Sequence, residues 1–136
     1  MKGLSNHYLN QLSLYCLKDF SGVFPCDFLT EKKSRTNSKY IVNLDASDNP
    51  GSHFVAISVR GHNIFYFDSF ALPCTNKYIL QAVIESKKQL IYSISPIQSI
   101  TSMFCGYFCL SFLILDEYNI KMSDFFTIVW QKLFTN

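Results

Sequence analysis

The chain lacks a long apolar run, an excess of one charge and a recognisable metal-binding pattern. Its longest apolar run, residues 107–115, is far shorter than the roughly 20 residues that a transmembrane helix needs. The first residues contain no apolar segment of the kind that a signal peptide requires. We therefore expect a soluble protein that is intracellular or is delivered inside a particle.

The charge balance gives little support to nucleic-acid binding. The chain has 12 Lys and Arg against 10 Asp and Glu, so its formal net charge is +2, which is too small to indicate such a function by itself. Basic residues gather in the polar stretch 31–39, which we interpret as a solvated loop, with a nucleic-acid contact as the alternative. They are Lys32, Lys33, Arg35 and Lys39.

The cysteines are odd in number and irregular in spacing. They are Cys16, Cys26, Cys74, Cys105 and Cys109. This pattern favours free thiols in a reducing compartment, with one disulfide as the alternative. A zinc site would need four well-spaced ligands, and the three histidines of the chain do not complete a familiar set. We expect neither a metal nor another cofactor.

The order of predicted elements indicates an α+β fold. A chain of 136 residues that is 49% hydrophobic is expected to form one domain, residues 1–136, with a substantial core. Apolar spacing predicts helices over residues 4–18, 75–88, 103–116 and 123–133, and strands over residues 39–45, 53–59, 63–67 and 89–94. Residues 20–27 are interpreted as a turn or irregular segment. The expected architecture is a small, mainly antiparallel or mixed sheet flanked by helices.

Cys105 is the strongest candidate for a reactive residue. It is followed by Gly106 and then by an apolar run, so it lies where a loop turns into a buried helix. The helix dipole and the free N–H groups of a first turn favour the thiolate, which is the nucleophilic form of cysteine. The alternative is that Cys105 is a small buried hydrophobic residue. Cys109, one turn later, is interpreted as part of the core.

Three other polar residues could complete a catalytic site around this thiol. His53 begins one strand of a predicted hairpin and Asp68 ends the other, so we expect them to be cross-strand neighbours at the open end. A carboxylate beside an imidazole fixes its tautomer, which gives a Cys-His-Asp triad if Cys105 lies within reach. The side-chain amide of Gln98 could donate to an oxyanion. The alternatives are a polar rim histidine, a turn-capping aspartate and a solvated glutamine.

Taken together, these motifs resemble adenain-type cysteine proteases. The resemblance rests on residues 51–56 (Gly-Ser-His-Phe-Val-Ala), residues 66–70 (Tyr-Phe-Asp-Ser-Phe), and Gln98 seven residues before the Cys105-Gly106 pair. The clan includes the SUMO/Ulp1-type proteases, and similar proteases occur in Polinton/Maverick elements and virophages. Phe54 stands where many members have tryptophan, and Asp68 stands where adenain has glutamate.

The resemblance implies a papain-like-clan fold with the nucleophile at the N-terminus of a buried helix. It implies that Cys105 is the nucleophile, His53 the general base, Asp68 its orienting partner and Gln98 the oxyanion donor. The implied activity is cleavage of viral or transposon capsid and core precursors at Gly-containing sites, in the host nucleus or cytoplasm or in the virion. A deubiquitinase or SUMO-type isopeptidase is the first alternative, and a degenerate binding domain is the second. The resemblance also implies that DNA or a short peptide activates the enzyme.

Overall fold

A computed structural model describes residues 6–31, 37–45, 53–92 and 105–120. The predicted helix over residues 123–133, the glutamine at position 98 and most of the basic stretch lie outside the described residues. The elements in chain order are α1 (Asn6–Cys16), β1 (Phe20–Pro25), the 3-10 helix η1 (Cys26–Glu31), β2 (Asn37–Asn43), β3 (Phe54–Arg60), β4 (Asn63–Phe67), α2 (Lys77–Ser86), β5 (Gln89–Tyr92) and α3 (Cys105–Glu117). No described helix combines the length and apolar character that crossing a membrane requires.

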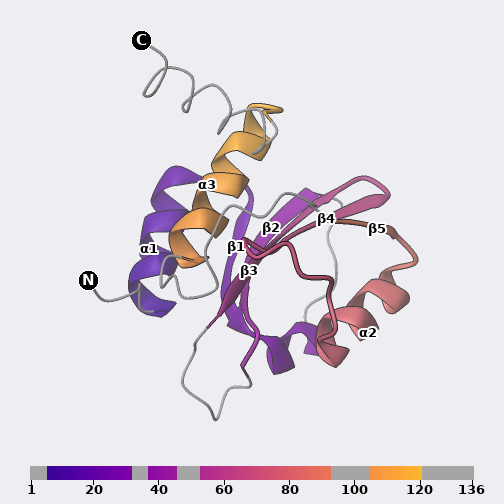
Figure 1. The fold of residues 1–136 in the computed structure, drawn as a ribbon. Coiled ribbons are helices and arrows are strands. Elements are labelled where there is room, and N and C mark those ends of the chain that lie inside the picture. The colour runs from indigo at the N-terminus through magenta and orange to yellow at the C-terminus, as the bar shows by residue number, and fades with distance from the viewer. Residues whose placement is uncertain (1–5, 32–36, 46–52, 93–104, 121–136) are drawn as a thin grey trace.

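The strands form one mixed sheet in the order β1-β2-β3-β4-β5 (Figure 1). The inner pairs β2–β3 and β3–β4 are antiparallel, whereas the outer pairs β1–β2 and β4–β5 are parallel. A two-residue turn joins β3 to β4, and Gly61 in that turn has a φ of +56°, which glycine adopts without steric cost. The α+β prediction is confirmed, with a sheet that is mixed.

The prediction of an irregular segment over residues 20–27 is wrong. Residues 20–25 form edge strand β1, and η1 follows directly. The ladder between β1 and β2 shifts register near Gly22, whose φ of +141° suits glycine. Asn10 of α1 accepts the backbone N–H of Val23 through its side-chain oxygen at 3.1 Å. Strand β1 is a bulged edge strand in a parallel pair, so its apolar and polar residues do not alternate strictly and no hairpin turn links it to β2. The local sequence pattern therefore does not reveal it.

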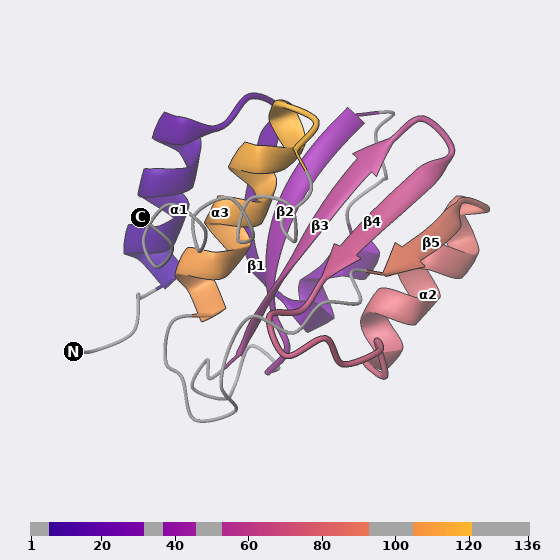
Figure 2. The same ribbon diagram turned by 45° about the horizontal axis from the view of Figure 1, so that its top comes forward.

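Helices cover both faces of the sheet. Figures 1 and 2 show α1 and α3 side by side on one face and α2 on the other. The core under α1 and α3 includes Leu9, Ile41, Phe67 and Leu113, and the core under α2 and η1 includes Leu29, Val42, Val55, Ile57 and Ile79. The rings of Phe67 and Phe112 stack at 4.7 Å between β4 and α3. Because α3 is apolar on most sides, it is held deep in the molecule.

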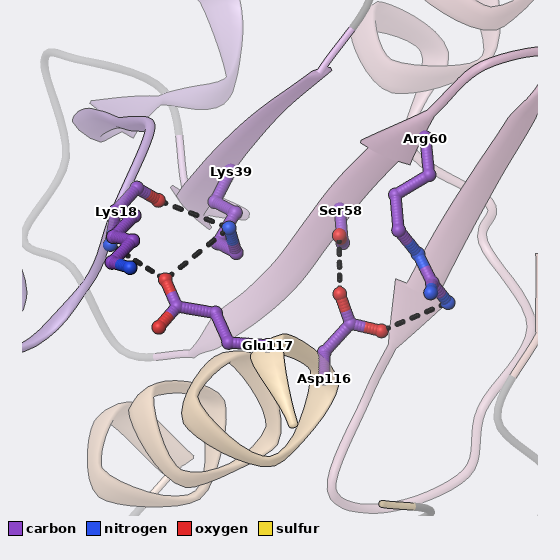
Figure 3. Close-up of polar contacts among 6 residues, drawn as sticks. All are labelled: Lys18, Lys39, Ser58, Arg60, Asp116 and Glu117. Atoms are coloured by element: carbon purple, nitrogen blue, oxygen red, sulfur yellow. Dashed lines mark hydrogen bonds and ion pairs between the residues drawn. The ribbon is translucent and has the colours of Figure 1, made fainter. Parts of the chain in front are cut away.

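The C-terminal end of α3 is fixed to the sheet by charged side chains (Figure 3). Asp116 accepts a hydrogen bond from the Ser58 hydroxyl at 2.7 Å and pairs with the Arg60 guanidinium at 3.1 Å. Glu117 pairs with the Lys39 ammonium at 3.3 Å and also accepts the backbone N–H of Lys18. Cations at the C-terminus of a helix also complement its dipole. These contacts hold the C-terminal end of α3, whereas Cys105 lies at its N-terminal end.

Candidate active site

His53 and Asp68 meet at the open end of the β3–β4 hairpin, although not in the predicted register. The observed ladder pairs Arg60 with Asn63 and Ala56 with Phe67. That ladder ends at Phe67 and has its midpoint one residue later than direct pairing of His53 with Asp68 would require, yet the prediction that the two residues are neighbours at the open end is confirmed. The Nε2 atom of His53 lies 3.0 Å from Oδ1 of Asp68.

A tight turn after β4 holds the carboxylate of Asp68 in place. The backbone carbonyl of Asp68 accepts the N–H of Ala71 at 2.8 Å, and its Oδ1 atom accepts the N–H of Phe70 at 2.9 Å. Ala71 has a φ of +58°, an uncommon conformation for alanine that closes this turn. The Asp68 side chain is only 4% exposed. The hydrogen bonds of the turn therefore orient the carboxylate independently of its contact with the imidazole.

Phe70 contributes an aromatic surface to the same cluster. Its ring stacks on the imidazole of His53 with a centroid distance of 4.7 Å and an interplanar angle of 8°. Sequence reasoning assigned no role to Phe70. Phe70 reaches His53 through the turn that follows β4.

Cys105 is brought to this cluster by the start of α3. Its sulfur accepts the backbone N–H of Phe54 at 3.3 Å. Cys105 is 4% exposed and belongs to the core under α3, but its sulfur also interacts with the His53 side chain. Since Nε2 of His53 faces Asp68, Nδ1 is the ring nitrogen left to face the sulfur. The structure thus brings Cys105, His53 and Asp68 together, whereas Gln98 lies outside the described residues.

The electrostatics of the cluster favour a charged pair. Burial by itself lowers the pKa of His53, but the hydrogen bonds with Asp68 and Cys105 and the nearby negative charges outweigh it and raise the pKa to about 9. Burial alone raises the pKa of the Cys105 thiol, yet hydrogen bonds from His53 and from the backbone N–H groups of Phe54 and Gly106 lower it below its ordinary value. Thiolate and imidazolium therefore stabilise each other.

The other cysteines have different surroundings. Cys109 is fully buried one turn along α3, and burial raises the pKa of its thiol well above the ordinary value. Cys26 donates to the Leu44 carbonyl at 3.2 Å, and burial raises the pKa of Cys74. Cys16 is exposed near the end of α1. Among the described residues, no three His, Cys, Asp or Glu side chains gather so as to hold a metal ion.

Comparison with solved structures adds a structural likeness. The chain is similar to the crystal structure of the ASFV pS273R protease, with a TM-score of 0.68 and 16% sequence identity. The likeness covers 91% of this chain and 61% of that chain, so this chain spans less than two thirds of the length of that protease. No protein-family model matches the chain. No curated protein matches it by sequence either. The chain therefore shares its α+β fold with that protease.

Proposed function

We propose that this chain is a cysteine endopeptidase in which Cys105 is the nucleophile, His53 the general acid and base, and Asp68 the residue that orients His53. The observation that carries the proposal is the imidazole of His53, which meets the Asp68 carboxylate at 3.0 Å and interacts with the Cys105 sulfur. The lowered thiol pKa supports a nucleophilic role. The fold shared with a viral protease supports proteolysis as the reaction.

The reaction follows from these positions. The thiolate of Cys105 attacks the carbonyl carbon of the scissile peptide, and the carbonyl oxygen takes the negative charge. The C–N bond then breaks while the imidazolium of His53 gives its proton to the leaving amine, which leaves a thioester on Cys105. Neutral His53 removes a proton from water, the resulting hydroxide attacks the thioester, and the acid product leaves. The thiolate and the imidazolium are restored.

The developing oxyanion needs donors near the sulfur. The backbone N–H of Cys105 lies in the first turn of α3, where the helix dipole favours negative charge. We assign the side-chain amide of Gln98 as its companion, on the strength of the resemblance to adenain. Removal of one such donor typically costs about 3–4 kcal/mol of transition-state stabilisation. Gln98→Ala should therefore lower kcat by a factor of about 100–1,000 while substrate binding persists.

The proposed substrates are capsid or core precursors of a virus or transposon, cut at Gly-containing sites. The adenain resemblance and the viral origin of the ASFV protease support this class. DNA or a short peptide as activator belongs to the same proposal. An isopeptidase for ubiquitin or SUMO would use the same chemistry, and the sequence resemblance to the SUMO/Ulp1-type proteases favours it as the second candidate.

Cleavage assays separate these candidates. Purified protein is incubated with a library of quenched peptides containing Gly motifs, and separately with fluorogenic ubiquitin and SUMO C-terminal substrates. Cys105→Ala should abolish cleavage, whereas Cys16→Ala, which removes an exposed thiol, should retain it. Preference for the folded ubiquitin-like substrates would establish the isopeptidase. Cleavage by Cys105→Ala at the wild-type rate would refute Cys105 as the nucleophile. No turnover of any substrate, with or without added DNA, would indicate a degenerate binding domain.

A further inference from the structure

We propose that Phe70 is a positioning residue, whose ring holds the imidazole of His53 in the plane where Nε2 meets Asp68 and the other ring nitrogen faces Cys105. The consequence for peptide cleavage rests on the proposed function, but the positioning itself can be measured without a peptide substrate. The supporting geometry is the near-parallel stack of the two rings, at 4.7 Å and 8°.

One turn controls both contacts of the imidazole. Oδ1 of Asp68, the atom that lies 3.0 Å from His53, also accepts the backbone N–H of Phe70 at 2.9 Å. The same turn is closed by the hydrogen bond from Ala71 to the Asp68 carbonyl. The carboxylate at the ring edge and the aromatic surface at the ring face therefore come from residues two apart and keep a fixed relation to each other.

An imidazole needs such a constraint, because rotation about its last side-chain bond is broad. A hydrogen bond at Nε2 fixes one edge of the ring but still allows the ring to tilt about that bond. A flat ring packed against the face opposes the tilt, and the negative face of an aromatic ring also attracts a cation. Phe70 thus favours the protonated ring in the orientation that stabilises the Cys105 thiolate.

The competing explanation is that Phe70 simply fills space beside the turn. Its side chain is half-buried, so ordinary packing would make the same contact. The two explanations differ in their dependence on aromatic character and on pH. A packing residue can be replaced by leucine without changing how the reactivity of Cys105 depends on pH, whereas a positioning residue cannot.

The test measures alkylation of Cys105 by iodoacetamide at about pH 6 and at about pH 10, quantified by mass spectrometry of the Cys105 peptide. Near pH 6 the thiolate depends on protonated His53, whereas near pH 10 His53 has lost most of its proton and the thiol ionises without that charge. Phe70→Leu should lower the ratio of the alkylation rate at pH 6 to the rate at pH 10 by about three- to tenfold. Phe70→Tyr, which keeps the ring, should retain the wild-type ratio.

Phe70→Met, also non-aromatic, is the second variant if Phe70→Leu fails to fold by circular dichroism. A wild-type ratio in the folded non-aromatic variant would overturn the inference, as would the same loss in Phe70→Tyr. Because alkylation needs no peptide, a lowered ratio in a protein that cleaves nothing would support the positioning role while refuting the proposed function. Peptide cleavage by the wild type, together with an unchanged ratio in the folded Phe70 variant, would support the proposed function and refute the positioning role.

Discussion

The sulfur of Cys105 and the backbone N–H of Phe54 join the first residue of α3 to the first residue of β3, at 3.3 Å. Because His53 directly precedes Phe54, this hydrogen bond also sets the distance between the thiol and the imidazole. The other end of α3 is tied to β3 through Ser58 and Arg60. The helix that carries the proposed nucleophile is therefore attached at both ends to the strand that follows the proposed base.

Peptidase activity should depend on pH through the charged pair. The acidic limb reports ionisation of the Cys105 thiol, whose pKa lies below its ordinary value, so activity rises there with pH. The alkaline limb reports loss of the His53 proton, so activity falls as the pH rises through about 9. Measuring kcat/KM from about pH 5 to about pH 10 tests this profile. An alkaline limb near 6.5, the ordinary pKa of histidine, would contradict it.

Asp68→Asn should move that alkaline limb toward lower pH. The amide oxygen can still accept from Phe70 and His53, but it lacks the negative charge that helps to raise the pKa of His53. Activity should fall by about 10- to 1,000-fold near pH 8 and by less near pH 6. Asp19→Asn removes one carboxylate at an exposed position and serves as the control. Equal losses at both pH values in Asp68→Asn would contradict the account.

Asp116→Ala should destabilise the protein through the far end of α3. The change removes the acceptor of Ser58, which is 1% exposed, and the ion-pair partner of Arg60. A buried hydroxyl left without a partner costs about 1–3 kcal/mol, so the free energy of unfolding should fall by about 2 kcal/mol. Urea unfolding measures this change.

Two further variants isolate the contact with Ser58. In a Ser58→Ala background, Asp116→Ala should cost less, because the stranded hydroxyl is already gone. Glu85→Ala removes an exposed carboxylate that accepts from Gln81 at 2.9 Å on α2, and should change the unfolding free energy by less than about 0.5 kcal/mol. Equal effects of Asp116→Ala and Glu85→Ala would show that the end of α3 is not held as described.

Asn76→Ala should weaken α2 and its attachment to the sheet. The Asn76 side-chain oxygen accepts the N–H groups of Tyr78 and Ile79 at 3.0 and 3.1 Å, and its amide donates to the Leu44 carbonyl at 3.4 Å. Losing an N-cap of this kind costs about 1–2 kcal/mol in urea unfolding. Asn76→Asp keeps the cap and should cost much less. Similar losses in both variants would assign the effect to the Leu44 contact instead.

The sequence predicted the parts of the fold that have strong local signals. The β3–β4 hairpin, α2 and the start of α3 near Cys105 lie where apolar spacing and turn residues indicated them. The meeting of His53 with Asp68 followed from their places at the two ends of one hairpin. Such signals depend on residues close in the chain, so a single sequence contains them.

The parts that were missed depend on distant pairing or on fine geometry. Strand β1 pairs in parallel with β2 across a register shift, which leaves no local alternation to detect. The midpoint of the β3–β4 hairpin lies one residue later than predicted, and Phe70 reaches His53 only through the turn after β4, which no local pattern reveals. The stacking of Phe70 on His53 therefore could not be foreseen, although both residues were visible in the motif.

The most direct test of the central claim is the covalent capture of the proposed nucleophile. The protein is treated with a peptide vinyl sulfone that ends in glycine, and the modified residue is located by mass spectrometry. We expect an adduct on Cys105, formed far more slowly in His53→Ala than in the wild type. An adduct on another cysteine, or the same rate of modification at Cys105 in both proteins, would contradict it.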